Sequence, residues 1–147
     1  DELNRLDEAI IVGEHAMALG EYDATPYLLS NLAYVYLRMQ RLDDAERAYR
    51  RLSQSGDASI ACVACGKLAD VAARRGDAAA CQTAVRAALD WLPRTQIYTA
   101  QVSAMAAVLR HGDDAQVRLA LAHRRAQAVD PGLQQRLDEA LRARGLT

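Results

Sequence analysis

The chain of 147 residues has no phenylalanine, and aromatic residues make up only 5% of it. Its hydrophobic fraction of 51% is dominated instead by Ala and Leu. Such side chains favour helices that pack closely on one another over the β-branched and aromatic core of a sandwich. The composition therefore predicts an all-α fold, and the length suits one domain over residues 1–147.

The chain also lacks an excess of either charge, since 18 basic and 19 acidic side chains leave a formal net charge of −1. We therefore expect no nucleic-acid partner. No apolar run approaches the roughly 20 residues that span a bilayer, and the N-terminus DELNRLDE lacks the features of a secretory signal. We expect no direct membrane insertion by this segment, and either a cytoplasmic location or a role as the soluble domain of a membrane-anchored protein.

Side chains suited to chemistry are scarce. Cys62, Cys65 and Cys81 are too few and odd in number for a disulfide framework. Cys62 and Cys65 form a C-x-x-C, but zinc needs about four ligands and only Cys81 offers a third. We therefore predict no catalytic, metal-binding or cofactor-binding residue and no cofactor, and a thiol redox or metal-binding role of Cys62 and Cys65 stays a minor alternative.

The three histidines give no catalytic set either. His15, His111 and His123 have no Ser, Cys or Asp partner at motif spacing, and no glycine-rich phosphate loop occurs in the chain. The expected protein is not an enzyme.

What the chain does contain is a short repeated motif. The segment RLDEA at residues 5–9 recurs 36 residues later as RLDDA at 41–45, and related segments begin at Arg75 (RGDAA) and at His111 (HGDDA). Each is polar and offers Asp or Gly to end one helix and cap the next. Each is therefore predicted to be the tight loop between two antiparallel helices. Because the chain begins without Met and within a repeat, we expect it to be a segment of a longer protein.

Between these loops, apolar residues recur at spacings of three and four, as on one face of a helix. Thr25-Pro26 and Asp130-Pro131 each place a capping side chain before a proline at the first helical position. The pattern predicts about eight helices, near residues 5–20, 26–40, 43–54, 59–75, 78–92, 96–110, 114–128 and 131–144.

The repeats resemble the tetratricopeptide repeat (TPR) family, whose unit is a helical hairpin of about 34 residues. Repeats that start at Pro26 and at Cys62 follow its pattern of large and small residues, and a degenerate one starts at Tyr98. The resemblance divides the chain into the second helix of a truncated repeat (1–25), repeats at 26–61 and 62–97, a degenerate repeat (98–130) and a C-terminal capping helix (131–147). It implies a right-handed α-α superhelix, a TPR-like solenoid of about three to four hairpins.

The resemblance also implies a non-catalytic scaffold for protein-protein interaction, which binds a partner protein or peptide in a concave groove. The first helix of each hairpin lines that groove. The family's groove offsets fall on Tyr27, Ser30, Tyr34, Leu37 and Arg38, on Val63, Gly66, Asp70, Ala73 and Arg74, and on Thr99, Val102, Ala106, Leu109 and Arg110. The candidate partner-binding residues are Tyr27, Asn31, Tyr34, Arg38, Lys67, Asp70, Arg74 and Arg110.

Two features of this set allow two interpretations each. Arg38, Arg74 and Arg110 recur every 36 residues and would suit an acidic or phosphorylated peptide. Alternatively, each stabilises the C-terminus of its own helix, by about 0.3 to 1 kcal/mol. Tyr27 and Tyr34, with Asn31 between them, either offer a flat surface to a peptide or cover a neighbouring hairpin.

A structural role is the main alternative to peptide binding. The repeats would then form a docking or self-association module within a larger bacterial membrane-associated assembly, of the secretion or polysaccharide export type. Exposed apolar residues on the outer faces or on the terminal hairpins would favour it, and a homo-oligomer is left open.

Overall fold

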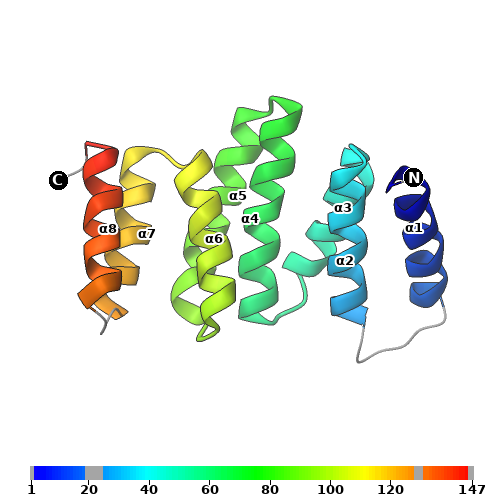
Figure 1. The fold of residues 1–147 in the computed structure, drawn as a ribbon, viewed down its shortest axis with the longest axis horizontal. Helices are drawn as coiled ribbons and strands as arrows, with labels where there is room; N and C mark the ends of the chain where they lie inside the picture. Colours follow the sequence, from blue (N-terminus) through cyan, green and yellow to red (C-terminus); the bar gives the residue numbers. More distant parts are fainter. Residues whose placement is uncertain (1, 19–24, 128–130, 146–147) are drawn as a thin grey trace.

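The computed structural model describes residues 2–18, 25–127 and 131–145, and none of these residues forms a strand. The α-helices are α1 (Glu2–Ala18), α2 (Thr25–Arg38), α3 (Leu42–Ser53), α4 (Ala58–Arg75), α5 (Ala78–Trp91), α6 (Tyr98–His111), α7 (Asp114–Gln127) and α8 (Pro131–Ala143). A 3-10 helix, Leu92–Arg94, follows α5. The all-α prediction is confirmed (Figure 1).

The predicted helix boundaries agree with the observed ones within a few residues. The start of α1 was placed too late, at residue 5 instead of Glu2. Thr25 is itself helical, so Pro26 is the second residue of α2 and the predicted cap at Thr25 is wrong by one position. The cap predicted at Asp130 lies outside the described residues, as do residues 19–20 and 128 of the predicted helices.

The loop between α4 and α5 has the chemistry that its sequence predicts. Gly76 ends α4 in the left-handed region, at φ 71°, which a residue without a Cβ adopts at little cost. The Asp77 carboxylate then accepts a hydrogen bond from the backbone N–H of Ala80 at 3.0 Å and caps α5. At α7, Asp113 and Gln116 form a reciprocal capping box, with the two bonds at 2.8 and 2.9 Å.

The helices lie side by side in an elongated row, with α1 at one end and α8 at the other (Figure 1). Two clusters of buried side chains hold the row together. The N-terminal core cluster draws on α1 to α4 and includes Ile10, Leu32, Tyr36, Tyr49 and Val71. The C-terminal core cluster draws on α4 to α7 and includes Cys62, Val85, Leu92, Met105 and Leu121.

Helix α4 joins the two halves of the row. It supplies Ala64 and Val71 to the N-terminal core cluster, and Cys62 and Ala69 to the C-terminal one. Leu68, half-buried, packs against both clusters. The helix therefore packs on α3 towards the N-terminal half and on α5 and α6 towards the C-terminal half.

Candidate functional site

Helices α2, α4 and α6 each present one row of side chains that are exposed or half-buried. The positions step by four, three and four residues, which keeps a row on one face of its helix. The rows are Tyr27, Asn31, Tyr34 and Arg38 on α2, Val63, Lys67, Asp70 and Arg74 on α4, and Thr99, Ser103, Ala106 and Arg110 on α6. All eight candidate residues lie on this surface, which we call the α2/α4/α6 face.

The N-terminal ends of these helices enclose an apolar hollow of about 590 Å³. Tyr27 and Ile97 line this hollow, and their side chains remain 73% and 54% exposed. Its lining residues are Pro26, Tyr27, Ser30, Tyr49, Leu52, Ser59, Ile60, Val63, Ala64, Ile97, Thr99, Ala100 and Ser103. Helix α4 starts four residues before the predicted repeat boundary at Cys62, and this extra turn supplies Ser59 and Ile60.

A polar network that the sequence did not predict fixes the hollow's edge. The hydroxyls of Ser59 and Thr95 are hydrogen-bonded at 2.6 Å, and Thr95 is only 2% exposed. The buried Gln101 donates its amide to the Thr95 carbonyl oxygen at 2.8 Å, and its own side-chain oxygen accepts from Arg124 at 3.3 Å. The network ties the start of α6 to α4 and α7, so these hydrogen bonds fix the position of α6 at the edge of the hollow.

The C-terminal ends of α2, α4 and α6 carry cations, most of which already have partners. Arg38 donates to Glu2 at 2.5 Å, and the guanidinium of Arg110 makes bonds of 3.1 to 3.3 Å to the carboxylate of Asp70. Among the described residues, Lys67 has no ion pair, although it lies on the same surface.

Arg74 has a different kind of partner. Its guanidinium donates to the backbone oxygen of Leu37 at 3.1 Å, in the last turn of α2. Arg144, just after α8, donates in the same way to the backbone oxygen of Leu109 in the last turn of α6, at 2.6 Å. These arginines thus stabilise the C-terminus of the neighbouring helix. The sequence pattern indicates only two partners for such an arginine, the end of its own helix or a ligand.

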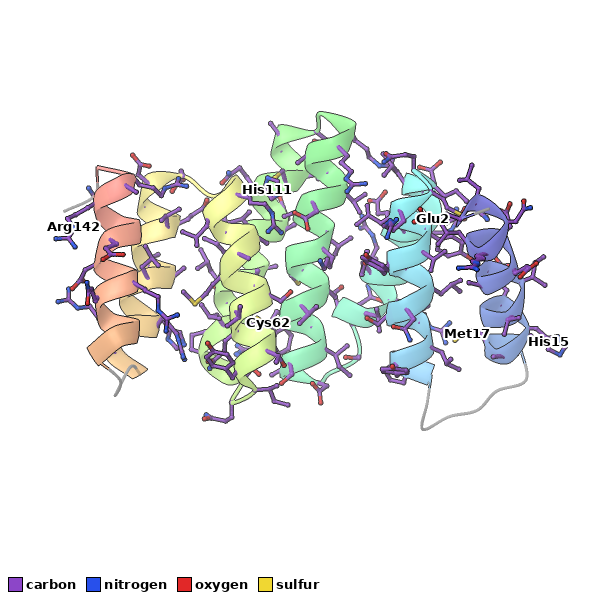
Figure 2. All side chains as sticks on the ribbon, in the orientation of Figure 1. Glu2, His15, Met17, Cys62, His111 and Arg142 are labelled. Carbon is purple, nitrogen blue, oxygen red and sulfur yellow. The ribbon has the colours of Figure 1, made fainter. Side chains whose placement is uncertain are left out.

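Asp70 also holds a histidine. The His111 ring nitrogen Nε2 lies 2.7 Å from an Asp70 carboxylate oxygen, and both side chains are less than one-fifth exposed. Figure 2 shows His111 at the end of α6. The pair joins residues 41 apart in sequence, so no motif spacing could have revealed it. Asp70 also pairs with Arg110, so the cluster of these three side chains links α4 to α6.

Two positions assigned to the groove by the family offsets are buried instead. Leu37 is 6% exposed and belongs to the N-terminal core cluster. Gly66 is buried where α6 approaches α4. The assignment of both is wrong, because the offsets define a helix face but not how far the neighbouring helix extends over it.

No family model, curated protein or solved structure matches this chain. What the surface can do therefore rests on its own geometry.

The three thiols lie within the helical layer, where Figure 2 shows Cys62. Burial raises the pKa of Cys62 to about 12 and that of Cys65 to about 11, and it also raises the pKa of Cys81. A neutral thiol is a poor nucleophile and a poor metal ligand. In the part of the chain that the structure describes, no group of three or more His, Cys, Asp or Glu side chains could hold a metal ion.

None of the described helices is long and apolar enough to cross a membrane.

Proposed function

We propose that this chain is a non-catalytic binding module that holds a segment of a partner protein on the α2/α4/α6 face. In this proposal the row of hairpins is a TPR-like, right-handed superhelix, and the face is its concave groove. The observation that carries the proposal is the apolar hollow, with Tyr27 and Ile97 left exposed beside it.

The hollow's size and lining suit a peptide side chain. Its volume of about 590 Å³ lies within the range of about 300 to 1,000 Å³ that is typical of ligand sites. Tyr27 is a rigid amphipathic side chain of the kind that anchors interfaces. Burying it beside a partner's apolar residue gains about 25 cal/mol per Å² of apolar surface removed from water. The hydroxyls of Ser30, Thr99 and Ser103 surround the hollow and are available to peptide backbone groups.

The exposure of the two tyrosines supports binding over internal packing. Tyr27 and Tyr34 are 73% and 49% exposed, so a large part of each side chain is free to contact a partner. Arg38, Arg74 and Arg110, which recur every 36 residues and which we call the arginine ladder, each have a partner within the chain, and this speaks against the ladder as a recognition element. The proposal therefore places the anchor in the hollow and gives the ladder no primary role.

Selection of peptides from a displayed random library on the immobilised protein tests this proposal. We expect enriched peptides that bind the wild type and lose at least about tenfold in affinity with Val63→Glu, which puts a charge into the hollow. Leu119→Glu is the matched control, because Leu119 is 64% exposed on α7 and does not line the hollow. No enrichment, or equal loss with both variants, would rule the proposal out.

A specific observation favours self-association through α1 as a second candidate. Val12 is 67% exposed, whereas Ala48, its counterpart 36 residues later on α3, is 6% exposed. The face of α1 that corresponds to a buried face of α3 is thus open, and Ile11 beside it is also 67% exposed. Sedimentation equilibrium should then show a dimer that Val12→Glu dissociates, while a wild-type monomer at every concentration would exclude this candidate.

A further inference from the structure

Positive charge exceeds negative charge along the C-terminal half of the α2/α4/α6 face. Arg38, Lys67, Arg74 and Arg110 stand there with two carboxylates, those of Glu2 and Asp70. Both carboxylates are occupied by arginines, and Asp70 also holds His111. The excess therefore resides on Lys67 and on the outer guanidinium donors of Arg74.

Lys67 is the cation nearest to the hollow along α4. It follows Val63, which lines the hollow, by four residues on the same face. Four residues of helix advance by about 6 Å. Two residues of an extended chain advance by about 6.6 Å, and side chains two apart point to the same side of such a chain. A segment that runs along α4 in either direction thus brings a residue over Lys67 when the residue two positions away from it fills the hollow.

We infer that the bound segment is an extended peptide with a large apolar anchor and, two residues from it, an Asp or Glu whose carboxylate pairs with Lys67. This inference rests on the proposed function, since it names the partner chemistry of the same surface. Lys67 is half-buried, and an ion pair there is less screened by solvent than one on an open surface. The excess of cations favours a negatively charged residue in the partner, and the hollow favours an apolar anchor side chain.

A defined peptide library tests the inference on the full chain. Each peptide has blocked termini, Leu, Phe or Tyr as anchor, and Asp, Glu, Asn or Gln two positions before or after it, in a Gly/Ser background. We expect the acidic peptides to bind the wild type about three- to tenfold more tightly than their amide counterparts, by fluorescence anisotropy. The preference should shrink as salt is raised.

Two variants locate the charge that is responsible. Lys67→Gln should abolish the preference for acidic peptides and keep the binding of amide peptides. Arg86→Gln is the matched control, because Arg86 is exposed on α5, has no ion pair among the described residues and removes the same charge. The control should retain the preference. Circular dichroism and thermal melting of Lys67→Gln should match the wild type, since no described ion pair is lost.

The outcomes separate this inference from the proposed function. Equal binding of acidic and amide peptides would overturn the inference and leave the hollow as the binding site. A preference that survives Lys67→Gln would also overturn it, because another cation would then carry it. If no library peptide binds and the display selection also enriches none, the proposed function itself fails.

Discussion

Gly66 shows how one residue sets the distance between two helices. A Cβ atom on it would lie 3.1 Å from the Cβ atom of Ala107 and 3.6 Å from the Cα atom of Ala104. The close approach of α4 and α6 on this side of the array therefore depends on the missing side chain. The family offsets place Gly66 on the partner face, since a one-dimensional pattern carries no information on interhelical distance.

Enlarging Gly66 should separate α4 from α6. We expect Gly66→Leu to lower the free energy of unfolding by about 1 to 3 kcal/mol, because the added atoms have no space between the helices. Urea denaturation followed by circular dichroism measures the change. Ala73→Leu, at an exposed position of the same helix, is the control and should stay within about 0.5 kcal/mol of the wild type. Equal effects of both variants would show that the close contact is unimportant.

Buried acids make the protein sensitive to alkali. Burial raises the pKa of Cys62 from its usual 9.0 to about 12, and that of Cys65 to about 11. Burial also raises the pKa of Tyr36 to about 12, with help from its hydrogen bond to Glu14. A group whose pKa is higher in the folded than in the unfolded state stabilises the fold below its unfolded pKa, and this contribution is lost as pH rises through the folded value.

Stability should therefore begin to fall above pH 9 and continue to fall toward pH 11 to 12. The free energy of unfolding, measured by urea titration at several pH values, gives the slope. The double variant Cys62→Ala, Cys65→Ala removes two of the groups and should show a shallower decline from pH 9 to 11. A native protein whose thiols react rapidly with a disulfide reagent at neutral pH would contradict this account and revive the redox alternative.

At the scale of the element, local chemistry made the helices predictable. A cap acts within a few residues, so Gly76 and Asp77 mark a helix end and a helix start in the sequence itself. The extra first turn of α4 was anticipated by a start near residue 59, yet its contribution to the hollow was not. That contribution depends on where α2 and α6 lie, and no sequence signal near residue 59 indicates the positions of these helices.

The cap of α4 gives an element-scale prediction. The Asp57 carboxylate accepts backbone N–H bonds from Ser59 at 2.9 Å and from Ile60 at 3.0 Å. Asp57→Ala should destabilise the protein by about 1 kcal/mol, and Asp57→Asn, which keeps an acceptor, should cost less. Because the capped turn carries Ser59 and Ile60 to the hollow, Asp57→Ala should also weaken any peptide that binds there. Thermal melting measures the loss of stability, and the anisotropy assay measures the loss of peptide affinity. Equal melting temperatures of Asp57→Ala and Asp57→Asn would argue against the cap.

Across the whole molecule, the sequence predicted that the chain is helical and about where each helix lies, but not how the helices share a core. Repeated spacing identifies equivalent residues, such as Tyr27, Val63 and Thr99 at one level of α2, α4 and α6. It does not reveal contacts between unlike residues, of which Arg74 with Leu37 and His111 with Asp70 are examples. Those contacts join α4 to α2 and to α6, so they depend on how whole helices pack.

An array in which each unit contacts only its neighbours should unfold from its ends. Helix α1 has Ile10 as its one buried residue in the described part of the chain, whereas eight residues of α4 are buried and α4 enters both core clusters. We therefore expect native-state hydrogen exchange to be fastest in the amides of α1 and slowest in those of α4 and α5. Mass spectrometry of exchanged peptides resolves the helices.

The same experiment bears on function, because binding and stability are linked in an array of this kind. A peptide held by α2, α4 and α6 bridges both core clusters, and it should slow exchange in α2 and α6 more than in α4, which is already the most protected. Protection of α1 equal to that of α4 in the free protein would mean that the row unfolds as one unit. Protection by peptide confined to α4 would then place the bound segment on one hairpin instead of across the face.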